Sequence, residues 1–252
     1  MPALHVKEVI AMLEKRGSKK TRDGMARYGI VAPKAFGVPV GVIQQIGKNV
    51  GKNHQLAAEL WESGWYEARM LTAFIDDPAL VTSKQMDDWV ADFDNWAICD
   101  TLCFHLFDRT AHAWTKVGPW SRRREEFVRR SAFALLAGLS LHDKKAGDEP
   151  FLKTLAYIER CADDDRNFVK KGVSWAFRVM GRRSAALHDA TLKLAREFAK
   201  SSDPTVKWQG NAAIVDLTSA AARKQVAARK RAALKTSGRR LGDAADSKRE
   251  RR

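Results

Sequence analysis

The chain has 252 residues, of which 45% are hydrophobic and 30% are charged. This balance is typical of a globular protein with a sizeable core, and no run of about 18 apolar residues could span a membrane. No basic segment followed by an apolar one opens the chain, so we expect no secretory signal. Three cysteines are too few for a disulfide framework, which favours a reducing cytoplasm.

The charge is strongly basic, with 45 Lys and Arg residues against 30 Asp and Glu residues and a net charge of +15. Twelve basic and three acidic residues fall in 223–252, so this segment supplies +9 and the rest of the chain still carries +6. A basic surface of this kind most often meets nucleic acid, although a purely solvating surface is the alternative.

Hydrophobic periodicity predicts helices from the N-terminus onward, and no alternation at period two indicates a sheet. A loop rich in Pro and Gly is expected from Gly29 to Gly41. The expected helices are His5–Lys15, a second one ending near Tyr28, and then Val40–Val50, His54–Ser63, Tyr66–Ile75 and Ser83–Phe93. The sequence therefore predicts an all-α chain.

The segment from Trp96 predicts a further helix, with Asp94 or Asn95 as its N-cap. Trp96 and Asp100 are four residues apart and so lie on one helix face, which continues into an apolar stripe. A carboxylate on such a stripe is costly unless a cation, hydrogen-bond donors or solvent in a cleft compensates. Asp100 is therefore either a buried structural acid, satisfied by an arginine or by backbone N–H groups, or a functional acid.

The second half of the chain contains a weak internal repeat with a spacing of about 40 residues, the period of HEAT-type helix pairs. Its copies begin at Phe127, Phe168 and Thr205, and Tyr66–Arg69 resembles an earlier one. The helix that precedes a copy, such as Pro150–Cys161, supplies the other half of the pair. We therefore expect a HEAT-like helical-repeat solenoid of stacked antiparallel helix pairs with a concave basic groove.

Basic pairs recur at the start of these copies and would form a ladder of positive charge suited to a phosphate backbone. The alternative interpretation is that each of these side chains is only part of a solvated helix surface. The candidate DNA-binding residues are Arg129, Arg130, Lys170, Lys171 and Lys207.

We expect a single HEAT-like domain over residues 1–236, followed by a basic, disordered C-terminal tail over 237–252. Residues from Arg223 to about Lys235 are expected to extend the final helix. The charge of the tail would raise non-specific DNA affinity and steepen its salt dependence.

Three motifs in this order resemble the AlkD-type DNA alkylation repair proteins, a family of HEAT-like-repeat DNA glycosylases. They are the Trp-x-x-x-Asp of Trp96 and Asp100, the Arg-Arg-x-Ala that begins at Arg129, and the Gly-x-x-Trp-Ala-x-Arg region of Gly172 to Arg178. The resemblance extends over roughly Ala26 to Leu217. It implies that Trp96, Asp100 and Trp175 line the catalytic cleft and that Arg130 contacts DNA beside it.

The resemblance further implies removal of N3- and N7-alkylated purines from duplex DNA, a base excision repair step in which the lesion stays largely in the duplex. The chemistry of the residue types agrees with this role. A carboxylate near the anomeric carbon, with Asp100 as our candidate, stabilises positive charge developing on the deoxyribose and can position water. Indole faces such as those of Trp96 and Trp175 attract cationic character. No lysine stands out as a Schiff-base nucleophile, so simple hydrolysis without strand cleavage is expected.

Other residue clusters are weaker indications of a functional site. Cys99 and Cys103 lie near His105, but no fourth ligand at a supportive spacing is evident, so we expect no metal site. No phosphate-binding glycine loop is present, and no cofactor is expected. Five tryptophans are interpreted as core or interface anchors: Trp61, Trp65, Trp89, Trp114 and Trp120.

Three functional hypotheses remain: an alkylpurine DNA glycosylase, a non-catalytic HEAT-like protein that binds distorted or branched DNA, and a protein–protein scaffold. The first requires Asp100 in an open basic groove near Trp96 and the second does not. We expect a monomer that acts on double-stranded DNA without a membrane partner, in the bacterial cytoplasm and at the nucleoid when bound to DNA.

Overall fold

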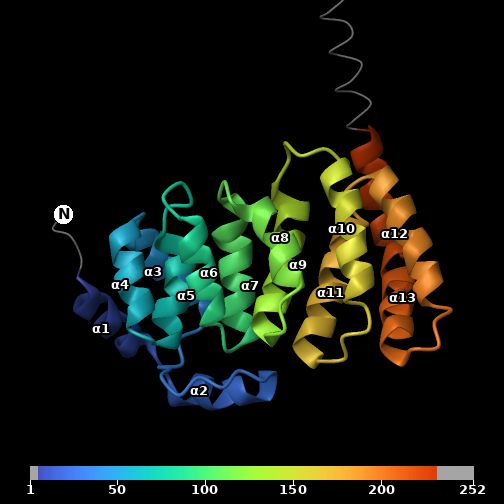
Figure 1. Cartoon of the computed structure of the whole chain (residues 1–252). Coiled ribbons are helices and arrows are strands. Elements are labelled where there is room, and N and C mark those ends of the chain that lie inside the picture. The colour runs from blue at the N-terminus through green and yellow to red at the C-terminus, as the bar shows by residue number, and fades with distance from the viewer. Residues whose placement is uncertain (1–4, 232–252) are drawn as a thin grey trace, which may run out of the picture. The chain divides into compact units, whose positions relative to one another are not determined.

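Helices make up the regular secondary structure of the computed structural model, which describes residues 5–231, and no strand occurs within that range. Two short 3₁₀ turns, η1 (Ala26–Tyr28) and η2 (Phe107–Arg109), follow α2 and α7. The helices in chain order (Figure 1) are α1 (Val6–Arg16), α2 (Lys19–Met25), α3 (Val40–Val50), α4 (His54–Glu62), α5 (Tyr66–Ile75), α6 (Ser83–Ala91), α7 (Trp96–His105), α8 (Ala113–Ser121), α9 (Glu126–His142), α10 (Glu149–Arg160), α11 (Asn167–Met180), α12 (Ala185–Phe198) and α13 (Pro204–Leu217).

These bounds agree with the sequence-based helices to within one or two residues, and Val40–Val50 and Tyr66–Ile75 match at both ends. The second predicted helix is divided into α2 and η1, which ends at Tyr28. Residues 220–231 are also helical, as expected for the start of the C-terminal extension. The predicted disordered tail over 237–252 lies outside the described residues.

The chain divides into two compact units. Among the described residues, unit 1 contains 5–143 and 166–173, and unit 2 contains 144–165 and 174–231. The prediction of one domain over residues 1–236, and that of a concave basic groove, stay predictions.

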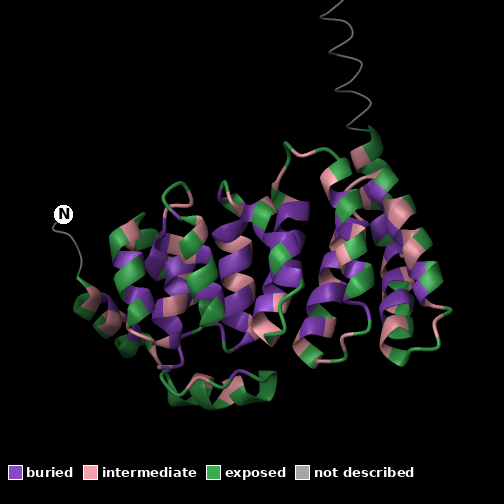
Figure 2. Cartoon of the chain, in the orientation of Figure 1, coloured by how far each residue is buried: buried purple, intermediate pink, exposed green. Residues whose placement is uncertain are grey.

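In unit 1 the helices pack in successive layers, with α5 against α3, α4 and α7, and α9 against α7 and α8. Buried residues lie where these helices face one another (Figure 2). Large side chains with less than 2% exposure, such as Trp61, Phe107 and Phe133, fill this core. The indole rings of Trp61 and Trp89 stack with their centroids 4.4 Å apart. These two tryptophans are core residues, as the sequence predicted.

The start of α7 is fixed by Asn95, whose side-chain oxygen accepts hydrogen bonds from the backbone N–H groups of Ala97 and Ile98 at 3.1 and 3.0 Å. Asn95 thus satisfies two of the N–H groups that a helix leaves unpaired at its first turn. This N-cap is one of the two that the sequence allowed. It places Trp96 as the first residue of α7 and Asp100 one turn later.

Unit 2 has its own core, in which α12 packs against α10 and α13. A Cβ atom on Gly210 would collide with the backbone of Ala195 and Ala199, so glycine permits the close approach of α13 to α12. The guanidinium of Arg182 donates two hydrogen bonds to the two carboxylate oxygens of Asp216, at 2.9 and 2.6 Å.

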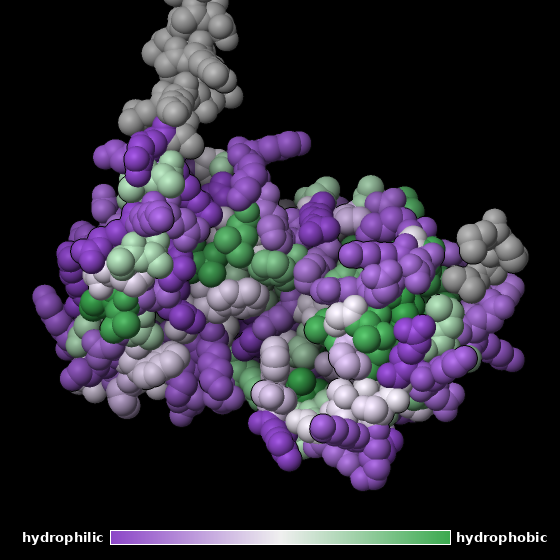
Figure 3. All heavy atoms as spheres, turned by 180° about the vertical axis from the view of Figure 1, so that it is seen from behind, coloured by the Kyte–Doolittle hydropathy of each residue, from purple (hydrophilic) through white to green (hydrophobic). Residues whose placement is uncertain are grey.

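Hydrophilic side chains cover most of the surface seen in Figure 3, with smaller apolar areas between them. Within the described residues, no helix is both long and apolar enough to cross a lipid bilayer.

Candidate active site

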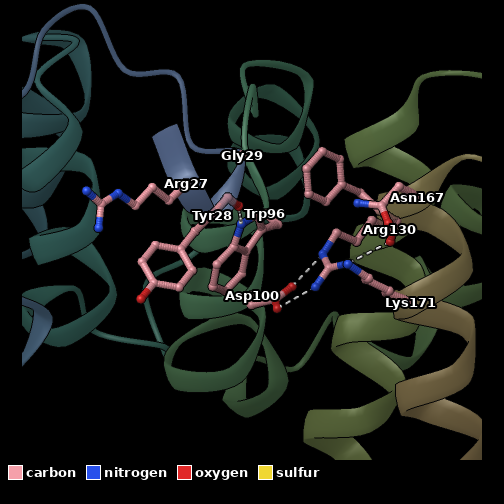
Figure 4. A pocket seen from close by; sticks show the side chains of 9 residues that line it. Arg27, Tyr28, Gly29, Trp96, Asp100, Arg130, Asn167 and Lys171 are labelled. Carbon is pink, nitrogen blue, oxygen red and sulfur yellow. Dashed lines mark hydrogen bonds and ion pairs between the residues drawn. The ribbon is translucent and has the colours of Figure 1, made fainter. Parts of the chain in front are cut away.

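An open cavity of about 480 Å³ in unit 1 brings together residues from four separate segments of the chain (Figure 4). Helix α7 contributes Trp96 and Asp100, α9 contributes Arg130, and α11 contributes Lys171. The remaining wall comes from η1 and the start of α11. Its residues are Arg27, Tyr28, Gly29, Asn167 and Phe168.

The floor of this cavity is an ion pair between Asp100 and Arg130. The Arg130 Nε and Nη2 atoms donate to Asp100 Oδ1 and Oδ2 at 2.8 and 2.7 Å. The Arg130 side chain is only 7% exposed, whereas Asp100 keeps 20% of its side-chain surface open to the cavity. A third guanidinium nitrogen, Nη1, donates to the backbone oxygen of Phe168 at 2.6 Å. This parallel two-bond geometry is the strongest form of the Arg–carboxylate interaction.

Burial and the ion pair together set the pKa values of Asp100 and Arg130. Removal from water raises the pKa of Asp100, and the hydrogen bonds and charge of Arg130 offset only part of this effect. Burial also acts to lower the pKa of Arg130, but the bonded carboxylate outweighs it and the net pKa of Arg130 is raised. Arg130 is therefore permanently charged, while Asp100 takes up a proton at a higher pH than an exposed aspartate does.

The part of the cavity wall formed by residues 27–29 is bound to α7 through the indole of Trp96. Trp96 Nε1 donates a hydrogen bond to the backbone oxygen of Tyr28 at 2.8 Å, across 68 residues of sequence. Gly29 follows with a φ of +70°, and a Cβ atom there would lie 3.0 Å from the ring of Phe168. Glycine therefore satisfies both the left-handed backbone and the close approach of the wall to α11.

A buried carboxylate holds the loop that follows this wall. Glu67 has no exposed surface, and its two oxygens accept hydrogen bonds from the backbone N–H groups of Phe36, Gly37 and Val38 at 3.0, 2.7 and 3.2 Å. Three donors to one carboxylate compensate for its burial. Glu67 on α5 thus fixes the loop between Gly29 and α3.

The first residues of two helices line the cavity, Trp96 for α7 and Asn167 for α11. Helix N-termini carry partial positive charge, although Asn95 caps the first turn of α7 and the Phe168 N–H of α11 donates to Glu126 at 3.4 Å. Lys171, one turn into α11, adds a full charge at an exposed position. The cavity therefore combines a carboxylate, an aromatic face and an anion-attracting rim.

A second, more apolar cavity of about 730 Å³ shares Tyr28, Trp96 and Asp100 with the first. It lies between α2 and the first turns of α5 and α7, where Tyr66 and Met70 contribute apolar surface. The indole of Trp96 consequently forms part of the wall of both cavities.

The predicted site residues divide into three groups. Trp96, Asp100, Arg130 and Lys171 line one cavity. Arg129 and Lys170 are half-buried and are not among its lining residues. Two other predicted residues belong to unit 2, where Trp175 is half-buried and Lys207 is exposed. The roles of all eight stay predictions.

Sequence reasoning missed Arg27, Tyr28, Asn167 and Phe168 as lining residues. Tyr28 was expected only as the end of a helix, and nothing in the local sequence indicates its contact with Trp96. Asn167 did carry a signal, because a polar residue after the Asp-Asp-Asp-Arg run marks the start of a helix.

The cysteines are buried among helices. Cys99 Sγ lies 3.2 Å from the hydroxyl of Ser131, and Cys103 Sγ donates to the Ser131 backbone oxygen at 3.6 Å. Burial raises the pKa of the Cys103 thiol, which makes it an unreactive packing group. Across residues 5–231, no group of three or more His, Cys, Asp or Glu side chains is arranged to hold a metal ion.

Residues 9–202 match the family model described as DNA alkylation repair enzyme. The chain belongs to this family. One solved structure matches with a TM-score of 0.66 and 20% sequence identity. The match covers 77% of this chain and 83% of the solved chain. It is described as a new family of proteins related to the HEAT-like repeat DNA glycosylases, with affinity for branched DNA structures. No curated protein matches significantly.

The structural match confirms the predicted fold, an all-α chain of HEAT-like repeats, and the family match confirms the resemblance drawn from the three motifs. The matched segment includes Trp96, Asp100, Arg130 and Lys171 and ends just before α13. Membership of the DNA alkylation repair family points to DNA as the partner of this chain.

Proposed function

We propose that this protein is a DNA glycosylase that hydrolyses the N-glycosidic bond of N3- or N7-alkylated purines in duplex DNA, without extruding the lesion into a closed pocket. The observation that carries the proposal is the position of Asp100, whose carboxylate is partly exposed in an open cavity beside the indole of Trp96. Membership of the DNA alkylation repair enzyme family supports it.

The reaction needs little acid catalysis. A purine alkylated at N3 or N7 is already cationic, so it leaves as a neutral base when it takes the electron pair of the glycosidic bond. Positive charge then develops on the deoxyribose, and the oxygen of a water molecule attacks C1′ while one of its protons is released. The protein has to stabilise the sugar cation and orient the water.

Asp100 fits both tasks. Each of its oxygens accepts one hydrogen bond from Arg130 and retains further acceptor capacity toward the cavity. The Arg130 fork prevents the carboxylate from rotating, so its orientation is set before substrate binds. Because the pair lies at the base of a cavity, its electrostatic effect is stronger than it would be in bulk water.

The other lining groups complete the proposal. The face of Trp96 attracts cationic character on the sugar or the lesion. The exposed charge of Lys171 provides an attractive rim for a phosphate next to the lesion. In unit 2, Trp175 remains a candidate site residue on the basis of the motif resemblance, and Lys207 remains a candidate DNA-binding residue on the basis of the internal repeat.

A second candidate function is binding of distorted or branched DNA without catalysis. The specific observation in its favour is that Asp100 is already engaged in a two-bond ion pair with Arg130, as a structural acid would be. The solved structure with the same fold is described as having affinity for branched DNA. In this alternative, Asp100 serves only to hold Arg130 in place.

Release of N7-methylguanine and N3-methyladenine from methylated duplex DNA distinguishes the two functions. We expect release by the wild type and a reduction of about two orders of magnitude in Asp100→Asn. Equal release by both proteins would refute the role of Asp100. Absence of release by either, with duplex binding intact, would refute the glycosylase and favour the second candidate.

The chain offers a matched control in Asp216→Asn. Asp216 is 19% exposed and bound by two hydrogen bonds from Arg182, so its substitution removes the same kind of ion pair in unit 2. If Asp216→Asn lowers release as much as Asp100→Asn does, the effect reports general loss of stability rather than catalysis.

A further inference from the structure

A separate cavity of about 380 Å³ opens in unit 1 at the C-terminal ends of α3 and α7. Its polar lining residues are Gln44, Lys48, Lys52 and His105, and the Phe74 ring and two glycines form the rest. No carboxylate lines it. We call it the Lys48–Lys52 cavity. A concave site lined by two lysines and no acid is suited to an anion.

The carboxylate of the buried acid Asp76 is hydrogen-bonded to groups other than Lys52. Asp76 is fully buried, and its carboxylate is bound by His54 Nδ1 at 2.6 Å and Gln85 Nε2 at 2.9 Å. Lys52 donates to the backbone oxygen of Asp76 and not to its carboxylate. The charge of Lys52 is therefore not cancelled by a direct carboxylate contact.

A second buried acid next to the cavity behaves in the same way. Asp108 has no exposed side-chain surface, and His142 Nδ1 is hydrogen-bonded to its Oδ2 atom. Arg109 lies 3.9 Å from the other oxygen, and half of its side chain remains exposed. The charge of Arg109 acts on both Lys52 and His105, but it is shared with Asp108.

His105 supplies a hydrogen-bond donor and not a charge. Burial lowers its pKa, and the positive charges of Arg109 and His142 lower it further. At neutral pH the ring is therefore uncharged, with one N–H group to donate. It packs against Phe74, with the ring centroids 5.0 Å apart, and so has a defined orientation at the cavity wall.

Helix dipoles provide another role for these cations, because α3, α5 and α7 all end near this cavity. Each helix C-terminus carries about half a negative charge, and a lysine or histidine in the last turn offsets it. Lys48 and His105 occupy such positions. Asp76 and Asp77 act electrostatically on Lys52, and Asp108 pairs with Arg109, so the charges of these two cations are offset in part. Lys48 is exposed at a cavity that no carboxylate lines, and its full charge exceeds the half charge of the α3 C-terminus, so it remains available to a ligand.

The position of the cavity identifies the anion. His105 follows Asp100 by five residues of α7, which corresponds to about 7.5 Å along the helix axis. Duplex DNA carries about one phosphate charge per 1.7 Å of its axis. A duplex bound at Asp100 extends well beyond this distance, so it is long enough to present a backbone phosphate to Lys48 and Lys52.

We propose that the Lys48–Lys52 cavity is a second phosphate-binding site, which holds the DNA backbone at the end of α7 remote from Trp96. This inference rests on the proposed binding of duplex DNA, but not on glycosylase activity. The site fixes the duplex at two points on either side of Asp100. One point is the rim at Lys171, and the other is this cavity.

The test compares Lys48→Gln/Lys52→Gln with Lys84→Gln/Lys193→Gln, which removes the same charge from exposed lysines that line neither cavity. The affinity for an unmodified duplex is measured against salt concentration. Each phosphate contact contributes about 0.9 to the slope of log K against log salt. We expect the first variant to lose between about 0.9 and 1.8 in slope and the control to lose less than about 0.3.

A duplex carrying a neutral methylphosphonate at one position at a time then locates the contact. At one position the substitution should weaken binding by the wild type about tenfold and leave the Lys48→Gln/Lys52→Gln variant unchanged. Lys48→Gln alone, on an exposed side chain that leaves the Lys52–Asp76 contact in place, should show the same pattern at reduced amplitude.

Equal loss of slope in the variant and the control would overturn the site, because it would reveal diffuse charge only. Binding of inorganic phosphate that depends on Lys48, with an unchanged DNA slope, would overturn the assignment to DNA. The glycosylase proposal is tested separately by base release in Asp100→Asn, and its failure would leave the salt-slope test of this site unaffected.

Discussion

The guanidinium of Arg130 donates hydrogen bonds to both carboxylate oxygens of Asp100, at 2.8 and 2.7 Å. This ion pair lies at the base of a cavity, where a fifth of the Asp100 side chain remains exposed. The arginine itself is almost wholly buried and also binds the backbone oxygen of Phe168. A Cβ atom on Gly172 would lie 3.3 Å from Arg130 Cγ, so α11 presses directly on the guanidinium stem. The pair joins α7, α9 and the start of α11.

Replacing Arg130 should therefore cost more than replacing an exposed arginine. Arg130→Ala leaves a mostly buried carboxylate without its cation, and we expect the free energy of unfolding to fall by about 3–5 kcal/mol. Urea denaturation measures this change. Arg123→Ala, whose side chain is 55% exposed and pairs with Glu125, is the control, and its loss should be much smaller because solvent screens an exposed ion pair. Equal losses would show that the Asp100 pair contributes nothing special.

Arg130→Lys separates charge from geometry. A lysine keeps the positive charge but cannot form two parallel hydrogen bonds to one carboxylate. The Asp100 carboxylate then loses its fixed orientation, and we expect base release to fall at least tenfold while the affinity for an unmodified duplex changes less. Single-turnover release and duplex binding measure the two effects. Unaltered release would show that orientation by the fork is not required.

Base release should depend on the protonation of Asp100. Burial raises the pKa of this carboxyl group, so its ionised form is lost at a higher pH than usual as acid is added. The rate should be constant at high pH and fall about tenfold per pH unit below the pKa, because only the carboxylate stabilises the sugar cation. After spontaneous depurination is subtracted, the profile of Asp100→Asn should be low and flat. A falling profile in that variant would assign the titration to another group.

The indole N–H of Trp96 should be needed for the wall of the cavity. Trp96→Phe keeps an aromatic ring but removes the hydrogen bond to the Tyr28 backbone oxygen. We expect a stability loss of about 1 kcal/mol together with a reduced rate of base release. Trp114→Phe, which removes an indole hydrogen bond of 2.9 Å to Asp143, is the matched control and should affect stability alone. A reduced rate in both variants would remove Trp96 from the site.

Glu67 should act on the site without touching the cavity. Glu67→Gln replaces one acceptor oxygen with a donor, so at least one of the three loop N–H groups loses its partner. We expect the free energy of unfolding to fall by about 1–3 kcal/mol and hydrogen exchange to increase in residues 29–39. Increased exchange spread over the whole of unit 1 would contradict a role specific to this loop.

Much of the fold was predictable because its signals are local. The apolar periodicity of Val40–Val50 and Tyr66–Ile75 and the N-cap at Asn95 act within a few residues of the helices that they define. The internal repeat was visible because α9, α11 and α13 begin with related segments. The end of α7 at His105 was not predicted, because neither glycine nor proline marks it.

The site was less predictable. Spacing places Trp96 and Asp100 on one helix face, but nothing in the sequence indicates that Arg130 rather than Arg129 faces Asp100. The contact between Trp96 and Tyr28 is a backbone interaction across a long stretch of chain, which leaves no residue pattern. Lys48 and Lys52 were not singled out, because one lysine pair among 45 basic residues carries no distinguishing signal.

The hydrogen bond from Trp96 to the Tyr28 backbone oxygen joins two parts of the site that can vary in sequence independently. The ion pair belongs to helices that form the core of unit 1, whereas the wall belongs to residues 19–39, which lie over that core. None of the side chains of α2 and η1 is buried, so this part of the cover can change in sequence at little cost to the core, whereas the loop after it includes the buried Ile30 and Val38. Substitutions within residues 19–28 are therefore a route to altered substrate selectivity in which Asp100 and Arg130 stay untouched.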